Sequence, residues 1–172
     1  IENRSGNRFW RFGLSLQDDF EGNSAYTGSA SFTWTQINRL GAEWRNGVRL
    51  GEIQQLATEF YQPVDKLGRY LVSALASIDE NNVNSFVNGV IVDQSRVRRV
   101  LGQLAVGRIF GNSGEIRVGT VFGSGTTQSN IGSPYPSTTF DVGGIKASAS
   151  YDTLDNVYFP QRGLTATVGW IG

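Results

Sequence analysis

The chain has 172 residues, enough for one domain with a sizeable core, and its 15 Lys+Arg against 15 Asp+Glu argue against a nucleic-acid partner, which requires a basic excess. Because Cys and His are absent, thiol chemistry, disulfides, Cys/His metal sites and His-based triads are excluded, and we expect neither a metal nor a cofactor. No apolar run reaches the roughly 18 residues of a membrane helix. The first ten residues lack the apolar stretch of a signal peptide, so we expect a processed or excised piece.

Alternation of apolar and small polar residues with a period of two dominates the chain, which predicts β-strands rather than helices. The 22 Gly and 12% aromatic residues are also typical of an all-β protein. In the first half, the alternation covers residues 9–19, 25–36, 41–51, 55–63 and 69–79. The first three segments place their large apolar side chains mainly on one face, and the alternation in 55–63 and 69–79 is less clean.

The second half of the chain continues the pattern after Asn88-Gly89, a dipeptide typical of hairpin turns. Further strands are predicted at 97–110, 115–122, 143–152 and 164–170. Tight turns at 38–41, 65–68 and 111–114 alternate with a brief connection at 52–54 and with longer polar connections at 17–24, 80–92 and 124–139. We therefore predict an antiparallel up-and-down β-barrel domain over residues 1–172, with about eight to nine strands in this chain.

The orientation of the apolar face decides between a membrane barrel and a soluble one. A lipocalin-like barrel holds its apolar residues inside, whereas an outer-membrane barrel exposes them to lipid. In the cleanest strands the apolar register contains no charged residue. The opposite register mixes Gly, Ser and Thr with charges of both signs, as a hydrated lumen would: Arg11, Glu43, Arg45, Arg49, Glu115, Arg117, Lys146 and Asp152.

Large aromatic residues on the apolar register gather beside the tight turns. In an up-and-down meander these turns lie at the same rim, and a ring of outward aromatics marks a lipid–water interface. We therefore predict a lipid-facing aromatic girdle of Trp10, Phe12, Trp34, Trp44, Phe60, Tyr70, Phe110 and Tyr151. The pattern favours a transmembrane β-barrel.

One turn of this rim carries a more specific signature, "YDTLDNVYFPQRG" at 151–163. Its Asp, Asn, Pro and Gly residues suit a well-capped turn on chemistry alone. The pattern formed by Asp152, Asp155, Asn156, Phe159, Pro160 and Gly163 also resembles a periplasmic turn of the BamA/TamA-type outer-membrane barrels, the bacterial surface antigens. The stretches "NRLGAEWRNGVRLGE", "LATEFYQP" and "FDVGG" resemble the C-terminal barrel of patatin-like autotransporters of the type V kind.

This resemblance implies a barrel of about 16 strands, of which the chain holds about half. It further implies a translocator or anchor in the bacterial outer membrane, preceded in the parent protein by a POTRA domain and a patatin-like phospholipase passenger. The implied partners are outer-membrane lipid and those two domains. Separately from the resemblance, an unpaired edge strand is a strong association site, so we also expect a second copy of the chain as a partner. The Arg-Gly-Phe motif of the family's inward-folding loop is missing from this chain.

Two other interpretations remain open at this point: a complete small outer-membrane protein of about eight strands, and a soluble ligand-binding barrel. An enzyme is least favoured, since Ser124 in "FGSGT" lacks the first glycine of the patatin nucleophile motif G-x-S-x-G. The carboxylates Asp18, Asp19 and Glu21 are better explained as a solvated acidic loop than as a metal site. We expect no catalytic residue in this segment.

Overall fold

The computed structural model describes residues 6–18, 24–51, 53–87, 90–111, 113–131, 137–153 and 164–172. Within these ranges the chain forms β-strands and no helix, so the expected all-β fold is confirmed. None of these residues belongs to a helix of the length and apolarity needed to cross a membrane. The strands are β1 (Arg8–Asp18), β2 (Ser24–Trp34), β3 (Glu43–Gly51), β4 (Ile53–Pro63), β5 (Tyr70–Val87), β6 (Val90–Phe110), β7 (Gly114–Ile131), β8 (Ser137–Asp152) and β9 (Thr165–Ile171).

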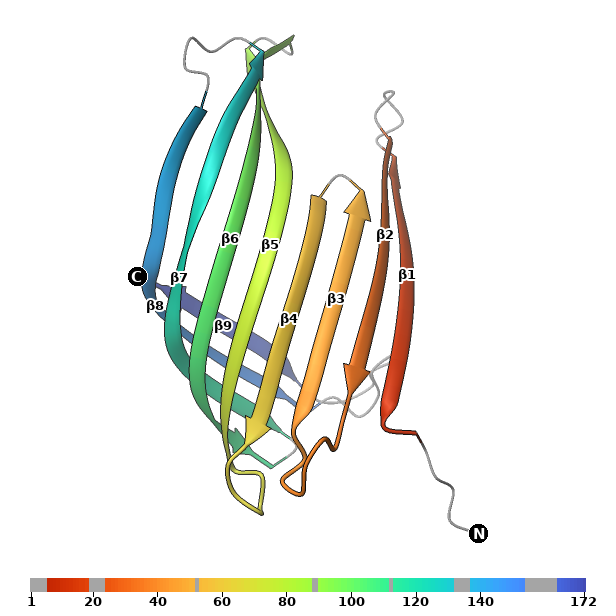
Figure 1. Cartoon of the computed structure of the whole chain (residues 1–172), viewed down its shortest axis with the longest axis vertical. Helices are drawn as coiled ribbons and strands as arrows, with labels where there is room; N and C mark the ends of the chain where they lie inside the picture. Colours follow the sequence, from red (N-terminus) through yellow and green to blue (C-terminus); the bar gives the residue numbers. More distant parts are fainter. Residues whose placement is uncertain are drawn as a thin grey trace.

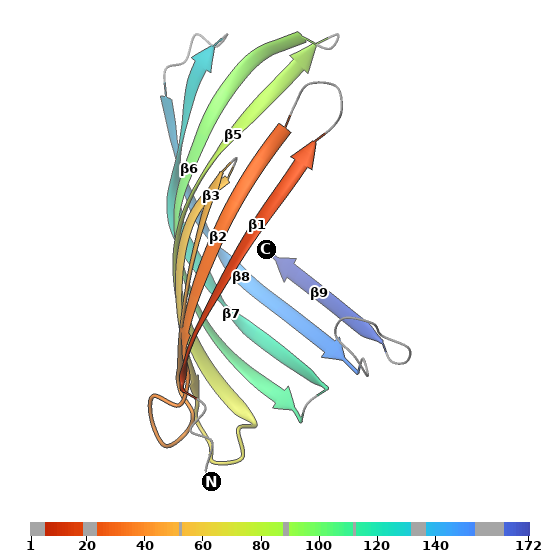
Figure 2. The same cartoon turned by 90° about the vertical axis from the view of Figure 1, so that its right-hand side faces the viewer.

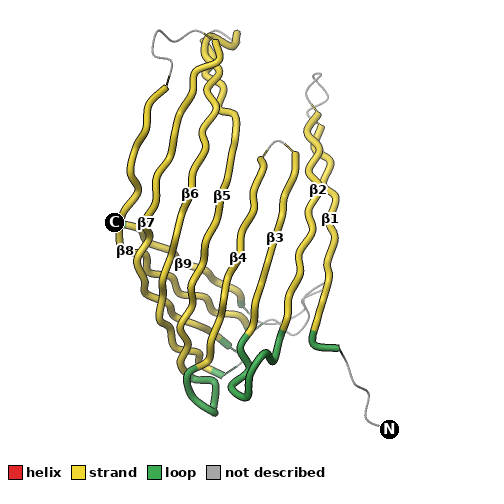
Figure 3. The backbone as a smooth tube through the Cα atoms, viewed as in Figure 1, coloured by secondary structure: helices red, strands yellow, loops and turns green. Residues whose placement is uncertain are grey.

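All the strands belong to one antiparallel sheet in the order β1 to β9, each paired with the next along the chain (Figure 1). This is the predicted up-and-down meander. Figure 2 shows that the sheet is strongly curved, and the backbone trace in Figure 3 follows the same curve through every strand. Strands β1 and β9 form the two edges, so the described residues make an open, curved sheet rather than a closed barrel.

Side-chain contacts identify the concave face of the sheet. Arg117 Nη1 on β7 lies 2.9 Å from Glu59 Oε1 on β4, although β5 and β6 run between these strands. Neighbouring strands are about 4.8 Å apart, so the backbones of β4 and β7 would be about 14 Å apart in a flat sheet. The two side chains meet because their face is the inner one of a curved sheet. Tyr61, Leu71 and Asp79 share this register and are buried.

The other register carries the large apolar side chains, and they are exposed on the convex face. Phe12 is 78% exposed and Leu14 is 85% exposed. Among the described residues, buried apolar side chains are few, and Leu71 is the largest that is fully buried. The described chain therefore buries almost no apolar core of its own.

Several strands are longer than the sequence pattern indicated. The segments 80–92 and 124–139 were expected to be mostly polar loops, and this expectation is wrong: β5 continues to Val87, β6 begins at Val90, and β7 continues to Ile131. The predicted turn Asn88-Gly89 lies outside the described residues, and Val87 at the end of β5 pairs with Val90 at the start of β6. Polar residues were interpreted as loop, but Ser, Thr and Asn can extend a hairpin whose backbone groups pair with a neighbouring strand.

The tight turns predicted at 38–41, 65–68 and 111–114 connect β2 to β3, β4 to β5 and β6 to β7. Asn38 Oδ1 accepts hydrogen bonds from the backbone N–H groups of Leu40 at 3.0 Å and Ala42 at 3.2 Å, which closes the first turn. Asp65 Oδ1 plays the same role for Arg69 at 2.7 Å and Tyr70 at 3.0 Å. These turns lie together at one end of the sheet, hereafter the short-turn rim (Figure 1).

Glycines on the concave face allow β6 and β7 to approach closely. A Cβ atom on Gly119 would lie 2.2 Å from the carbonyl oxygen of Leu104, and one on Gly123 would lie 2.0 Å from that of Val100. No side chain fits in these spaces, so any larger residue would push the two strands apart. The curvature of the sheet thus depends on small residues on its inner face.

Candidate functional site

The convex face carries an apolar band, interrupted on β3 and β4 by the hydrogen-bonded pair Asn46 and Thr58. The band is bounded at the short-turn rim and again part-way up the strands. On β5 the band extends from Tyr70 to Ile78 and ends at Glu80, the next residue of that register. These residues span about 26 Å along the strand, or about 20 Å of height for a strand tilted by 35–45°. Apolar bands of outer-membrane barrels are about 25 Å tall. The observed band is close to this height.

Above the band the same register becomes polar on four neighbouring strands. Glu80 of β5 forms an ion pair of 3.4 Å with Arg96 of β6. Beyond Ile78 and Val100 the outward positions are Glu80, Asn82, Arg96, Arg98, Ser124, Thr126, Gln128, Thr139 and Asp141. Ile78 and Val100, the last apolar residues of β5 and β6, pair with each other. Val100 pairs with Ser124 and Ser124 with Asp141, so the change occurs one position earlier on β7 and β8.

The aromatic residues that the sequence pattern assigned to a girdle lie on this convex register. Those described as exposed are Trp10, Phe12, Trp44, Phe60, Tyr70, Phe110 and Tyr151, whereas Trp34 is half-buried beside Trp44. Phe12 pairs with Ala30 and lies farther from the rim than Trp10, which pairs with Phe32. The rings of Trp10 and Phe32 pack with their centroids 4.8 Å apart.

Arginines accompany the aromatics at the short-turn rim. The guanidinium carbon of Arg8 lies 4.9 Å from the ring centroid of Trp34, and that of Arg69 lies 5.9 Å from Tyr70. Arg108 lies 5.6 Å from the Tyr70 ring and 5.2 Å from the Phe110 ring. Each pair is within the range of a cation–π interaction. The sequence pattern identified the aromatics, but it did not single out these cations.

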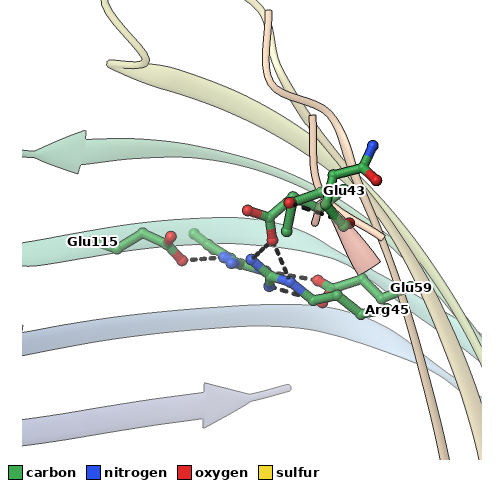
Figure 4. A network of polar contacts seen from close by, with 7 residues as sticks. Glu43, Arg45, Glu59 and Glu115 are labelled. Atoms are coloured by element: carbon green, nitrogen blue, oxygen red, sulfur yellow. Dashed lines mark hydrogen bonds and ion pairs between the residues drawn. The ribbon is translucent and has the colours of Figure 1, made fainter. Parts of the chain in front are cut away.

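The concave face holds a network of ionised side chains that joins β3, β4 and β7 (Figure 4). Arg45 Nη2 lies 2.7 Å from Glu43 Oε2, and Arg45 Nη1 lies 3.2 Å from Glu59 Oε2. On the other side, Glu59 Oε1 accepts a hydrogen bond from Arg117 Nη1 at 2.9 Å, and Arg117 also pairs with Glu115. Glu59 therefore bridges two arginines that come from strands on either side of it.

Tyr61 provides the aromatic surface against which this network packs. The guanidinium carbons of Arg45 and Arg117 lie 4.6 Å and 5.5 Å from its ring centroid. The ring is 8% exposed. Each arginine thus has carboxylate partners in addition to one shared ring, an arrangement that holds both guanidinium groups in fixed positions.

The remaining residues that we assigned to the lumen lie on the same concave register. Lys146 Nζ donates a hydrogen bond of 3.2 Å to Gln103 Oε1 across β7. Arg11 and Arg49 line a recess of about 290 Å³ on β1 to β4 with Ser29, Ser31 and Gln55. The structure therefore unites Glu43, Arg45, Glu115 and Arg117 in one network and leaves Arg11, Arg49 and Lys146 apart from it.

Sequence reasoning missed two groups of concave residues. The alternation in residues 55–63 places Glu59 and Tyr61 opposite the apolar Phe60, but neither was among the residues assigned to the lumen. Asp79 and Arg99, which pair at 2.7 Å across β5 and β6, were not identified either. Counting from the Val87–Val90 pair would set Asp79 opposite Arg98, and the register shift between Ser85 and Phe86 sets it opposite Arg99 instead. The contact from β4 to β7 was not accessible in this way because it depends on the curvature of the sheet.

Most of the turn motif falls outside the described residues, namely Asp155, Asn156, Phe159, Pro160 and Gly163. Asp152 lies at the end of β8, where its backbone N–H donates to Ser113 at 2.8 Å. Thr153 and Leu164 close the β8–β9 connection, with the Thr153 N–H donating to the Leu164 carbonyl at 2.9 Å. The end of β8 and the start of β9, which flank this connection, lie at the short-turn rim (Figure 1).

The acidic segment near Asp18 falls largely outside the described part of the chain, which includes neither Asp19 nor Glu21. Within the described residues, no group of three or more Asp or Glu side chains is arranged to hold a metal ion. Ser124 lies on the convex register of β7, at the upper boundary of the apolar band. Its place in a strand differs from the flexible loop expected there.

Comparison with known proteins identifies the fold. The sequence matches no protein-family model and no curated protein. Among solved structures, the chain is similar to BamA from Haemophilus ducreyi lacking POTRA domains 1–3, with a TM-score of 0.68 and 13% sequence identity. The open sheet therefore resembles part of a BamA barrel in fold. The similarity covers 95% of this chain and 33% of that one, so the chain spans about a third of the length of its structural relative.

Proposed function

We propose that this chain is part of an outer-membrane β-barrel whose apolar band contacts lipid and whose concave face lines an aqueous interior. The observation that carries the proposal is the opposition of the two faces: exposed aromatic and aliphatic side chains on one, and the Glu43–Arg45–Glu59–Arg117–Glu115 network on the other. Such an apolar face would be costly in water but suits acyl chains. Strand pairing meanwhile satisfies the backbone groups within the sheet.

The similarity to BamA in fold supports this orientation, and the length of the chain supports a partial barrel. An open sheet leaves unpaired backbone groups along β1 and β9, which are costly in lipid. In the proposed function these edges pair with further strands, either of the parent protein or of a second copy of the chain. A partner at these edges would complete the barrel.

We propose further that the barrel serves as the translocator and anchor of a patatin-like autotransporter. The support is the sequence resemblance of residues 38–52, 56–63 and 140–144, with the turn at 151–163. In this proposal a POTRA domain and a phospholipase passenger belong to the parent protein, and the barrel itself performs no catalysis. The parent protein would then hydrolyse phospholipid, whereas this chain alone would show no activity above that of buffer.

Lipid-attached quenchers test the orientation directly. The full chain would be folded into vesicles that contain phospholipids brominated along their acyl chains, and the fluorescence of its four Trp residues would be recorded. We expect strong quenching, because Trp10 and Trp44 lie exposed on the convex face and Trp170 does so on β9. A chain that stays monodisperse in buffer without detergent and shows no quenching would contradict the proposal.

The other two interpretations make different predictions. A soluble ligand-binding barrel requires the apolar register inside, opposite to the exposure of Phe12 and Leu14. A complete eight-stranded barrel requires a closed sheet, whereas the described strands form an open sheet with edges at β1 and β9. Measurement of the barrel diameter in lipid would separate a small closed barrel from a larger assembly, because the diameter grows with strand number.

A further inference from the structure

A shallow groove of about 530 Å³ crosses the convex face of β4 to β7, within the apolar band. Its outward-facing residues include Phe60, Val72, Ala74, Leu104, Val106 and Val118. Ala74 pairs with Phe60 on one side and Leu104 on the other, so a small side chain lies between two large ones and forms the floor. The volume is in the range of small-molecule sites, and the lining is almost wholly apolar.

Arg108 lies at the end of this groove nearest the short-turn rim. On β6 it is the next outward residue after Val106, and it pairs with Tyr70 and Ile116. Its guanidinium group is held between the rings of Tyr70 and Phe110, at 5.6 Å and 5.2 Å from their centroids. The rings restrict the position of the cation without neutralising its charge.

The charge of Arg108 has no carboxylate partner among the described residues. Arg69, whose guanidinium carbon lies 5.9 Å from the same Tyr70 ring, differs in this respect because its Nε lies 2.9 Å from Asp65 Oδ2. An uncompensated guanidinium group beside an apolar groove is complementary to a molecule with an anionic oxygen-rich group and an apolar chain. Guanidinium groups bind phosphate oxygens through paired hydrogen bonds.

We propose that the groove and Arg108 together bind one phospholipid molecule, with an acyl chain along Ala74 and the phosphate group against Arg108. The proposal rests on the proposed function, since the groove must face lipid. It goes further because it assigns one specifically bound phospholipid to a defined position on the barrel surface, whereas the proposed function requires only non-specific contact with the bilayer. A basic side chain at a membrane surface strengthens the binding of an anionic lipid about fivefold.

Native mass spectrometry tests the site on the full chain, folded into dodecyl maltoside micelles with added phosphatidylglycerol. Arg108→Gln is compared with Arg96→Gln, a change on the same strand and face beyond the other boundary of the band. Ala74→Leu, which fills the groove floor, is compared with Ala149→Leu, an outward position on β8 outside the groove. We expect Arg108→Gln to weaken binding of the first lipid about fivefold. Ala74→Leu should also weaken it, because the larger side chain occupies the groove floor, and the two controls should change little.

Several outcomes would overturn the proposal. Equal effects of Arg108→Gln and Arg96→Gln would show that Arg108 contributes only to the overall charge and does not bind the lipid specifically. An unchanged lipid affinity in Ala74→Leu would show that the groove does not contact the lipid. Competition by acyl-free glycerophosphoglycerol at the same concentration would indicate a phosphate site without an acyl chain. If Arg108→Gln fails to fold, Arg108→Lys and the comparison of Ala74→Leu with Ala149→Leu still test the proposed lipid site. Failure of the unmodified chain to enter vesicles at all would instead contradict the proposed function.

Discussion

Replacement of Glu59 by Gln tests whether the concave network stabilises the curved sheet. The change keeps the shape of the side chain but removes the charge that attracts Arg45 at 3.2 Å and Arg117 at 2.9 Å. A hydrogen bond to a charged group contributes about 1.5–3 kcal/mol to stability. The Arg117 contact dominates, because that side chain is 21% exposed and that of Arg45 is 39% exposed. Since each arginine keeps a second glutamate, we expect a loss of about 2 kcal/mol in the free energy of unfolding.

Equilibrium unfolding by guanidinium chloride in lipid vesicles, followed by Trp fluorescence, measures this loss. Glu80→Gln is the matched control, because Glu80 pairs with Arg96 at 3.4 Å on the exposed convex register. Exposed pairs contribute little, so this control should lose less than about 0.5 kcal/mol. Equal losses in the two variants would refute the argument that enclosure by the curved sheet strengthens the network.

Three further perturbations test the other parts of the structure. Gly119→Val should weaken or prevent folding into lipid, as judged by gel mobility without heating, because its side chain would collide with the Leu104 carbonyl oxygen. Leu104→Arg, in the middle of the apolar band, should cost about 2–4 kcal/mol in vesicle-based unfolding, and Leu101→Arg on the opposite register should cost less. Asp65 has a pKa below its ordinary value of 3.8, chiefly because its carboxylate accepts the Tyr70 N–H and then because it pairs with Arg69. Its stabilising effect on the turn is present above the unfolded pKa and is lost as pH falls through the lower folded value, so an NMR titration should show the Tyr70 amide shifting below pH 3.8.

Much of the fold could be predicted from the sequence because a period of two fixes which side chains share a face. The alternation placed Trp44 and Phe60 on one side and Arg45 and Glu115 on the other, and the tight turns set the order of the strands. Strand length could not be predicted in the same way. Polar residues such as those after Phe122 occur both in loops and in strands that extend beyond the apolar band, and only their pairing distinguishes the two.

The residues that meet in the concave network could not all be predicted, because their contacts depend on the curvature of the whole sheet and not on the sequence of any one strand. Pairing of neighbouring strands explains contacts such as Arg45 with Glu59, which are opposite each other in the β3–β4 register. The bridge from Glu59 to Arg117 instead requires the sheet to bend over three strand spacings. We attribute that bend to glycines on β6 and β7, such as Gly107, Gly119 and Gly123. In the sequence each of these glycines is only a position without a side chain, and none indicates curvature by itself.

Curvature also links the two faces of the sheet. On the concave face, Gly119 and Gly123 let β6 and β7 approach each other, and this bend brings Arg117 within reach of Glu59. On the convex face the same bend separates the outward side chains, which opens space above small residues such as Ala74. Because one bend creates both features, a substitution that flattens the sheet should weaken the charged network and remove the groove together. A substitution that leaves the bend unchanged should affect only the face on which it lies.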